Sequence, residues 1–296
     1  MRNFNFKSPT QIVFGKGTIA KLDELISQDE KILLTYGGGS IFKNGVYEQV
    51  KTALGDRQVI EFGGIESNPT FETLMKAVEV GRREKVTFLL AVGGGSVLDG
   101  TKFIAAAIPY EGDDPWDLLS KNAKVIRAIP LASVMTLPAT GSEMNSGAVI
   151  SRKATQEKLS FGDWKLAPQF SILDPETTYS LPKNQIRNGI VDSYIHVMEQ
   201  YLTYPVVTPL QDRQAEAILK TLVEESDAIL AEPADYDARA TYMWSATQAL
   251  NGNLSCGVVT DWATHGIGHE ITAFYGLAHA ETLAIVYPAL IRYKKE

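Results

Sequence analysis

The sequence predicts an α/β protein in which an N-terminal doubly wound parallel sheet precedes an all-helical domain. Short apolar runs of strand length alternate with amphipathic segments through residue 173. Two of these runs end in the same tetrapeptide, Gly-Gly-Gly-Ser, and after residue 181 only helical periodicity remains. Strands that alternate with helices at this spacing are typical of a parallel sheet with both faces covered.

Length and composition indicate a globular protein of about two domains. The 296 residues are 45% hydrophobic, which is enough to form real cores. A net charge of −7 without a polybasic run predicts no nucleic-acid binding. One cysteine, Cys256, excludes an internal disulfide, and the N-terminus lacks the long apolar run of a signal peptide or membrane span. We therefore expect a cytoplasmic protein that does not contact a membrane.

The first 54 residues contain the first strand–turn–helix unit. Residues 3–15 resemble strands that end at a glycine-rich turn, and a short helix is expected over 18–26. The apolar run 31–36 predicts a strand, which Gly37, Gly38, Gly39 and Ser40 close before an amphipathic segment continues to Ala53.

The next 54 residues repeat this pattern. A strand is expected over 58–62 and a helix from Thr70, as its N-cap, to about residue 84. Residues 87–92 form a fully apolar strand, followed by the second Gly-Gly-Gly-Ser turn at 93–96 and a helix over 97–108.

The two glycine turns predict a phosphate-binding edge of the sheet. Each closes a strand and opens a helix, where exposed N–H groups and the helix dipole favour a bound anion. The standard G-x-G-x-x-G pattern is absent, because Phe42 and Leu98 stand where the third glycine would be. Simple tight turns therefore remain the structural alternative.

The chain from 109 to 181 completes the sheet domain. A strand is expected over 129–137, then a polar helix start over 138–143 whose Thr140 and Ser142 hydroxyls either cap the helix or meet a phosphate or nicotinamide. Residues 147–151 and 170–173 read as short strands with Lys158 in the connection between them. The predicted domains are 1–181 and 182–296, the second with helices over 183–203, 208–231, 235–251, 260–274 and 280–290.

The histidines of the helical domain predict a metal site. His265 and His269 are four residues apart and so share a helix face, and His279 follows a glycine break. His196 has the same spacing from Asp192. A carboxylate with neutral imidazoles is a ligand set for zinc or a similar divalent ion. Spacing does not decide which of these residues are ligands and which move protons, and a set of buried core histidines is the structural alternative.

Several motifs together resemble those of the iron-containing, or group III, alcohol dehydrogenase family, and are most similar to its NADPH-dependent butanol dehydrogenase and aldehyde reductase branch. They are the Gly15-x-Gly17 turn, both Gly-Gly-Gly-Ser turns, GGGSVLDGTK at 93–102, LPATGSE at 137–143, Asp174-Pro175, and Asp192-x-x-x-His196 with the histidine cluster. The resemblance implies a dehydroquinate synthase-like architecture, with a metal between a dinucleotide domain and a helical domain. It also implies further helices beyond the last, so we expect the helical domain to be short at its C-terminal end.

The resemblance also assigns roles to individual residues. It implies that the metal ligands are Asp192, His196, His265 and His279, which leaves His269 as the non-ligand beside the nicotinamide. We expect His269, or a water or ribose relay that it contacts, to supply the proton in catalysis. The cofactor-binding residues that we expect are Gly37, Gly38, Gly39, Ser40, Asn68, Gly94, Gly95, Ser96, Asp99, Thr136, Thr140, Ser142 and Lys158.

The implied function is hydride transfer between NADP(H) and small aldehydes or primary alcohols, favouring aldehyde reduction, in a homodimer with one Zn²⁺ or Fe²⁺ per chain. NAD-using relatives carry an acidic residue in the first strand-to-helix turn, where residues 37–40 of this chain have none. A 2′-phosphate can then sit on backbone N–H groups and Ser40, which predicts NADP over NAD.

Two alternative functions are open at this point. A lyase of the dehydroquinate synthase type would need a cluster of Lys and Arg for an acidic substrate, and segments 187–199 and 260–282 contribute only Arg187. A non-catalytic nucleotide or metal sensor would bind the cofactor without turnover.

Overall fold

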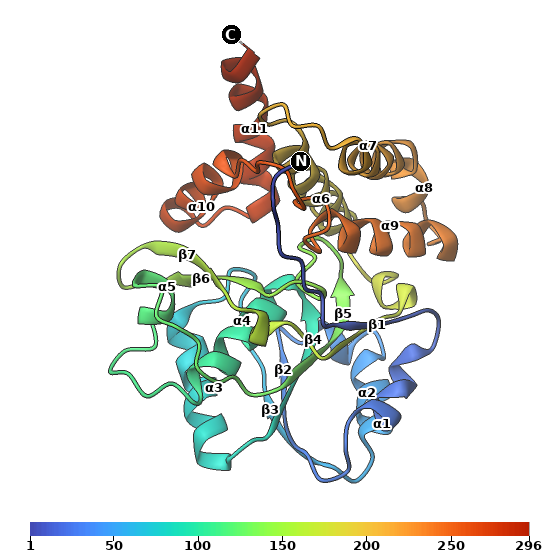
Figure 1. Ribbon diagram of the computed structural model, residues 1–296. Helices are drawn as coiled ribbons and strands as arrows, with labels where there is room; N and C mark the ends of the chain where they lie inside the picture. The colour runs from blue at the N-terminus through green and yellow to red at the C-terminus, as the bar shows by residue number, and fades with distance from the viewer. Residues whose placement is uncertain (296) are drawn as a thin grey trace. The chain divides into compact units, whose positions relative to one another are not determined.

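The computed structural model describes residues 1–295 and contains two compact units (Figure 1). The sheet unit comprises Pro9–Thr136 and Ser142–Ser180. The helical unit comprises Met1–Ser8, Leu137–Gly141 and the chain from Leu181 onward. The mixed α/β class predicted from the sequence is confirmed, and the two units are described separately below.

The sheet unit contains a six-stranded sheet with the strand order β1-β8-β5-β4-β2-β3. Adjacent strands run parallel, with Ile32 of β2 beside Val59 of β3 and Phe88 of β4. Strands of this sheet that are buried on both faces are continuous apolar runs, as β2 is. The bounds are β1 Gln11–Phe14, β2 Lys31–Tyr36, β3 Gln58–Phe62, β4 Phe88–Gly94, β5 Leu131–Leu137 and β8 Phe170–Leu173.

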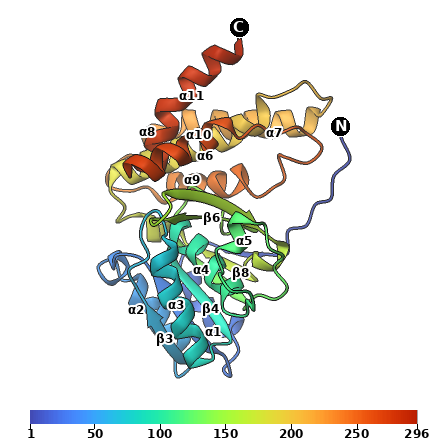
Figure 2. The ribbon, with the colours of Figure 1, turned by 90° about the vertical axis from the view of Figure 1, so that its left-hand side faces the viewer.

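Helices cover both faces of this sheet (Figures 1 and 2). Helices α1 and α2 lie on one face, where Ile32 and Leu34 join their core. Helices α3 and α4 lie on the other face, and there the Thr35 hydroxyl is 2.6 Å from that of Thr101. The bounds are η1 Thr18–Lys21, α1 Leu22–Leu25, η2 Ser40–Phe42, α2 Val46–Leu54, α3 Phe71–Glu84, α4 Gly95–Ala107, α5 Asp117–Ser120, η3 Trp164–Leu166 and η4 Pro175–Thr178.

Local sequence explains where α3 begins and ends. The Thr70 side chain accepts a hydrogen bond from the backbone N–H of Thr73, so the predicted N-cap is confirmed. At the other end, Lys85 adopts a left-handed backbone conformation with φ of 54°, which stops the helix.

Three predictions about local structure are wrong. Residues 3–10 form no strand. Residues 157–162, expected as a connection, form strand β7 (Glu157–Gly162), which pairs antiparallel with β6 (Gly147–Arg152) and places Lys158 opposite Ser151. Residues 138–143 form a turn and start no helix. The hydroxyls of Tyr242 and Ser193 donate to the carbonyl oxygens of Pro138 and Ala139, which a helix would have used itself.

The helical unit has its own cores. Ile186, Leu222 and Ile229 pack with the fully buried Tyr242 in one of them. No helix among residues 1–295 is long and apolar enough to cross a membrane. The bounds are α6 Lys183–Tyr201, α7 Pro209–Glu224, α8 Ser226–Ile229, α9 Tyr236–Ala249, α10 Ala263–Tyr275 and α11 His279–Lys295.

Candidate functional site

Helix α6 buries a carboxylate and an imidazole in the helical unit. Asp192 is 3% exposed and His196 is 4% exposed, one helical turn apart. Charged side chains are almost never buried to this degree without a partner. The sequence pattern Asp192-x-x-x-His196 therefore marks a polar face turned into the protein.

Helices α10 and α11 bring two more imidazoles to this face. His265 lies in the first turn of α10 and is buried. The helix ends at Gly276, whose left-handed conformation (φ 69°) reverses the chain. His279 is the first residue of α11, so it returns toward α6.

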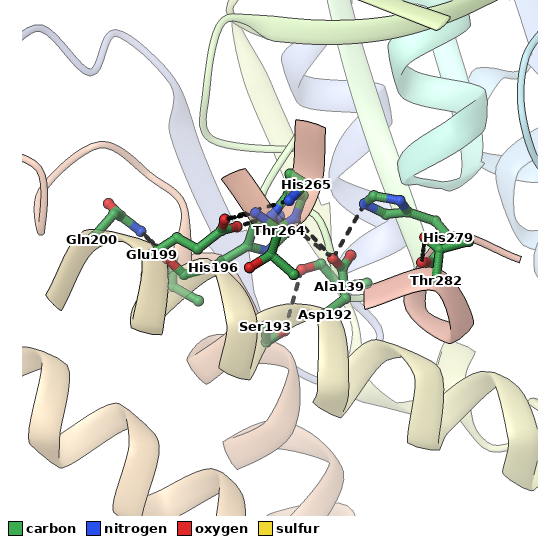
Figure 3. A network of polar contacts seen from close by, with 11 residues as sticks. Ala139, Asp192, Ser193, His196, Glu199, Gln200, Thr264, His265, His279 and Thr282 are labelled. Atoms are coloured by element: carbon green, nitrogen blue, oxygen red, sulfur yellow. Dashed lines mark hydrogen bonds and ion pairs between the residues drawn. The ribbon is translucent and has the colours of Figure 1, made fainter. Parts of the chain in front are cut away.

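The donor atoms converge on one carboxylate oxygen (Figure 3). Asp192 Oδ1 lies 3.5 Å from His196 Nε2, 3.5 Å from His265 Nε2 and 3.6 Å from His279 Nε2. Donor atoms of Asp192, His265 and His279 all lie within 4.8 Å of one another. That mutually close group does not include His196, although its Nε2 faces the same oxygen.

These distances fit a divalent ion. Tetrahedral Zn²⁺ has bonds of about 2.0–2.1 Å to nitrogen and oxygen, which places two ligands about 3.4 Å apart. Among the described residues, the buried Asp192 Oδ1 and His265 Nε2 have no hydrogen-bond partner. Burying such atoms unsatisfied is costly, and a shared cation would satisfy both.

The electrostatics of the cluster also suit a cation. Burial raises the pKa of the Asp192 carboxyl, but the surrounding imidazoles outweigh it and hold that pKa well below its usual range. Burial lowers the pKa of His196 to about 4, so its imidazole is neutral at pH 7, as a ligand must be. Burial likewise lowers the pKa of His265, but Asp192 and Glu199 outweigh it and raise that pKa to about 9. The two carboxylates therefore favour a positive charge at this position, which a bound cation would supply in place of the proton on Nε2.

His269 lies beside the cluster. It follows His265 by one turn of α10 and is half-buried. Its ring centroid is 6.2 Å from that of His265 and 5.2 Å from that of His279. The structure therefore places the predicted proton donor next to the predicted ligands and outside the mutually close group.

The two glycine turns lie side by side in the sheet unit. Strands β2 and β4 are neighbours, with Tyr36 opposite Val92 at their carboxyl ends. From β2 the chain continues to β3 on one side, and from β4 it continues to β5 on the other, so the strand order reverses between them. This switch point is where parallel α/β sheets bind ligands. A Cβ on Gly93 would lie 2.6 Å from Val97, so the second turn tolerates only glycine there.

The other predicted cofactor residues of the sheet unit form two linked groups. Lys158 Nζ donates to Asn68 Oδ1 at 3.0 Å, and the Ser96 hydroxyl donates to the backbone carbonyl of Ser67. Ser142 Oγ donates to Asp99 at 2.6 Å. Of the other two predictions, Thr136 is buried near the end of β5, and Thr140 belongs to the helical unit.

Lys102, which the sequence reasoning missed, holds this second group together. It is fully buried on α4. Its Nζ donates to Ser142 Oγ at 2.8 Å and to the carbonyl oxygens of Asn145 and Gly147 at 2.9 and 2.8 Å. Burial lowers its pKa to about 8. The sequence feature that could have pointed to Lys102 is a lysine within the otherwise apolar helix predicted over 97–108.

Lys102→Met is expected to lower the free energy of unfolding by about 2–4 kcal/mol, because each buried acceptor left unpaired costs about 1–3 kcal/mol. Part of this loss is offset because the variant no longer has to bury a charged ammonium group. Urea denaturation measures the effect. Lys76→Met is the matched control, since Lys76 is exposed on α3. Equal denaturation midpoints for the two variants would contradict the assigned role.

A dinucleotide-type parallel sheet and a buried carboxylate–imidazole site define a nucleotide-binding metalloprotein. Comparison with known protein families agrees with this class and identifies the family. The chain belongs to the iron-containing alcohol dehydrogenases: the model "Iron-containing alcohol dehydrogenase" matches residues 9–175, and "Fe-containing alcohol dehydrogenase family, C-terminal" matches residues 187–296. The family resemblance deduced from the motifs is confirmed.

Similar proteins cover this chain from end to end. It is 58% identical to NADPH-dependent aldehyde reductase YqhD of Escherichia coli K12, over 100% of this chain and 77% of the relative. It is 45% identical to NADP-dependent alcohol dehydrogenase 3 of Entamoeba histolytica, over 100% of this chain and 78% of the relative. A crystal structure of E. coli YqhD matches with a TM-score of 0.98 and 57% identity, covering 100% of this chain and 76% of that one.

Proposed function

We propose that this protein is a metal-dependent oxidoreductase that interconverts small aldehydes and primary alcohols with NADP(H), favouring aldehyde reduction. The observation that carries the proposal is the Asp192 oxygen surrounded by three imidazole Nε2 atoms at 3.5–3.6 Å. Family membership and the relatives named NADPH-dependent aldehyde reductase and NADP-dependent alcohol dehydrogenase support it.

The ligands in this proposal are Asp192, His196, His265 and His279, and the ion is Zn²⁺ or Fe²⁺, both of which accept imidazole and carboxylate. When bound, the cation supplies Lewis acidity toward the substrate carbonyl and the nicotinamide supplies the hydride. The burial of Asp192 and His196 shields these two ligands from water and helps to hold their geometry.

His269 is the proposed proton donor to the product oxygen. It is half-buried beside the ligands, so its ring remains in contact with solvent. General acid catalysis of this kind contributes about 10²–10⁴-fold to rate.

The proposed cofactor site uses the switch point of the sheet unit. Backbone N–H groups at the start of α4 would bind the pyrophosphate, and the turn formed by Gly37, Gly38 and Gly39 would bind the 2′-phosphate together with the exposed Ser40. Asn68, Gly94, Gly95, Ser96, Asp99, Thr136, Thr140, Ser142 and Lys158 complete the proposed set.

Ser40→Asp is expected to reduce the preference for NADPH over NADH by about 100-fold, since a carboxylate repels the 2′-phosphate and accepts hydrogen bonds from ribose hydroxyls. The ratio of kcat/KM for the two cofactors measures this preference. Ser40→Ala is the control for loss of the hydroxyl and should change the ratio much less. An unaltered ratio in Ser40→Asp would place the 2′-phosphate elsewhere.

NADPH oxidation with a panel of aldehydes, with and without added Zn²⁺ or Fe²⁺, tests the function. Stoichiometric consumption of NADPH with butanal, dependent on the metal, is the expected result. Cofactor binding without turnover would instead indicate a sensor. Turnover of a substrate without net NADPH consumption would indicate a lyase of the dehydroquinate synthase type.

We further propose a cytoplasmic homodimer. The single cysteine suits a reducing compartment. Strand β1 lies at the edge of the sheet and pairs on one side with β8, so its other side offers backbone groups for pairing with a second copy. Light scattering after size-exclusion chromatography should give twice the mass of 32.4 kDa.

A further inference from the structure

Glu199 is a buried carboxylate of α6 that no motif singled out. It is 5% exposed and follows Asp192 by seven residues, so two helical turns place both side chains on the same face. Both of its oxygens face the first turn of α10 (Figure 3).

One oxygen of Glu199 caps α10. Oε1 accepts the backbone N–H of Thr264 at 2.6 Å and that of His265 at 3.4 Å. The residue at the N-cap position, Trp262, makes no side-chain cap hydrogen bond. A carboxylate from another helix therefore satisfies two of the orphan donors of α10, where its charge also suits the helix dipole.

The other oxygen contacts the ring of His265. Oε2 lies against Nδ1, while Nε2 of the same ring faces Asp192 Oδ1 at 3.5 Å. An imidazole that donates its Nδ1 proton has Nε2 left as the lone-pair nitrogen. Metal-binding histidines are commonly held in this way by a carboxylate.

We infer that Glu199 is a positioning residue: it fixes the ring of His265 and keeps its proton on Nδ1, so that Nε2 is presented to the cation. This inference rests on the metal site of the proposed function. Glu199 acts through His265 and is not itself a ligand, because its two oxygens are committed to the first turn of α10.

Glu199→Gln separates this role from simple packing. The amide has the same shape and can keep one oxygen on the Thr264 N–H, but its NH₂ group then faces His265 Nδ1 as a donor. That arrangement favours the tautomer with the ring proton on Nε2, so Nε2 no longer has a lone pair with which to bind the cation. Zn²⁺ affinity, measured by competition with a chelator, should fall by about 10–100-fold while the helix cap persists.

The matched control is Glu216→Gln on α7, outside the metal site, where the carboxylate accepts a hydrogen bond from the hydroxyl of Tyr201. Its Zn²⁺ affinity should equal that of the unaltered protein. Circular dichroism and urea denaturation verify that both variants remain folded.

Nitrogen-15 NMR of the histidine rings provides a readout independent of both activity and mutation. Only four histidines contribute signals. In the Zn²⁺-loaded unaltered protein, His265 should show a protonated Nδ1 and a metal-bound Nε2. Binding through Nδ1, or a Glu199→Gln variant with undiminished affinity, would overturn the inference and leave the proposed function standing. An unaltered protein that binds neither Zn²⁺ nor Fe²⁺ would overturn both.

Discussion

His265→Ala is expected to abolish metal binding and turnover together. The ring is buried, its Nε2 faces Asp192 Oδ1 at 3.5 Å, and it belongs with Asp192 and His279 to the group of mutually close donor atoms. Without this ring the proposed ligand set falls from four side chains to three. Metal content by mass spectrometry should drop below one tenth of the unaltered value, and NADPH oxidation should drop by at least about 10³-fold, the scale of a lost Lewis acid.

His269→Ala is the matched control on the same helix. It should keep the metal, because His269 is not one of the four proposed ligands, and lose about 10²–10⁴-fold in kcat through the missing proton donor. The two variants thus separate binding from proton transfer. Full activity of His265→Ala in metal-free buffer would show that the cation has no Lewis-acid role.

Gly189→Ala is expected to have the largest effect on stability. Gly189 lies on α6, where an added Cβ would overlap the Tyr242 hydroxyl and lie 2.6 Å from the backbone carbonyl oxygen of Pro138. Neither neighbour has room to move, since Tyr242 is fully buried and its hydroxyl donates to that carbonyl. We expect the free energy of unfolding to fall by about 3 kcal/mol or more, at the upper end of overpacking costs.

Urea denaturation measures this change, and Gly266→Ala on α10 is the control. A Cβ on Gly266 meets nothing within 4 Å, and alanine is favoured over glycine inside a helix by up to about 1 kcal/mol. The two substitutions should therefore change stability in opposite directions. A stable Gly189→Ala variant would mean that α6 can shift away from Pro138.

Local sequence patterns predicted most of the helices and strands because the interactions that form those elements are between residues close in sequence. The apolar run of β2, the glycines that end it and the Thr70 cap of α3 act within a few residues, so the sequence shows them directly. Strand β7 has no such signal, since EKLSFG contains a charged pair and only two large apolar residues. It forms because β6 pairs with it, which is a tertiary cause.

The wrong prediction at 138–143 has a similar reason. The polar residues there resemble a helix start, but the partners that decide the outcome, Tyr242 and Ser193, are more than fifty residues away in sequence. Their hydroxyls take the carbonyl groups of Pro138 and Ala139 and keep the segment in a turn. Long-range hydrogen bonds of this kind are not visible in a local pattern.

By itself the sequence determined the α/β class, the paired glycine turns and the concentration of histidines near Asp192, because strand and helix periodicity and the spacing of ligands on a helix are local properties. Only the tertiary structure decided which nitrogen of each ring faces the carboxylate, and it alone revealed Glu199 and Lys102. Those two buried charges acquire their roles from partners on other elements, as Glu199 does from the first turn of α10, and the sequence does not show which partners meet.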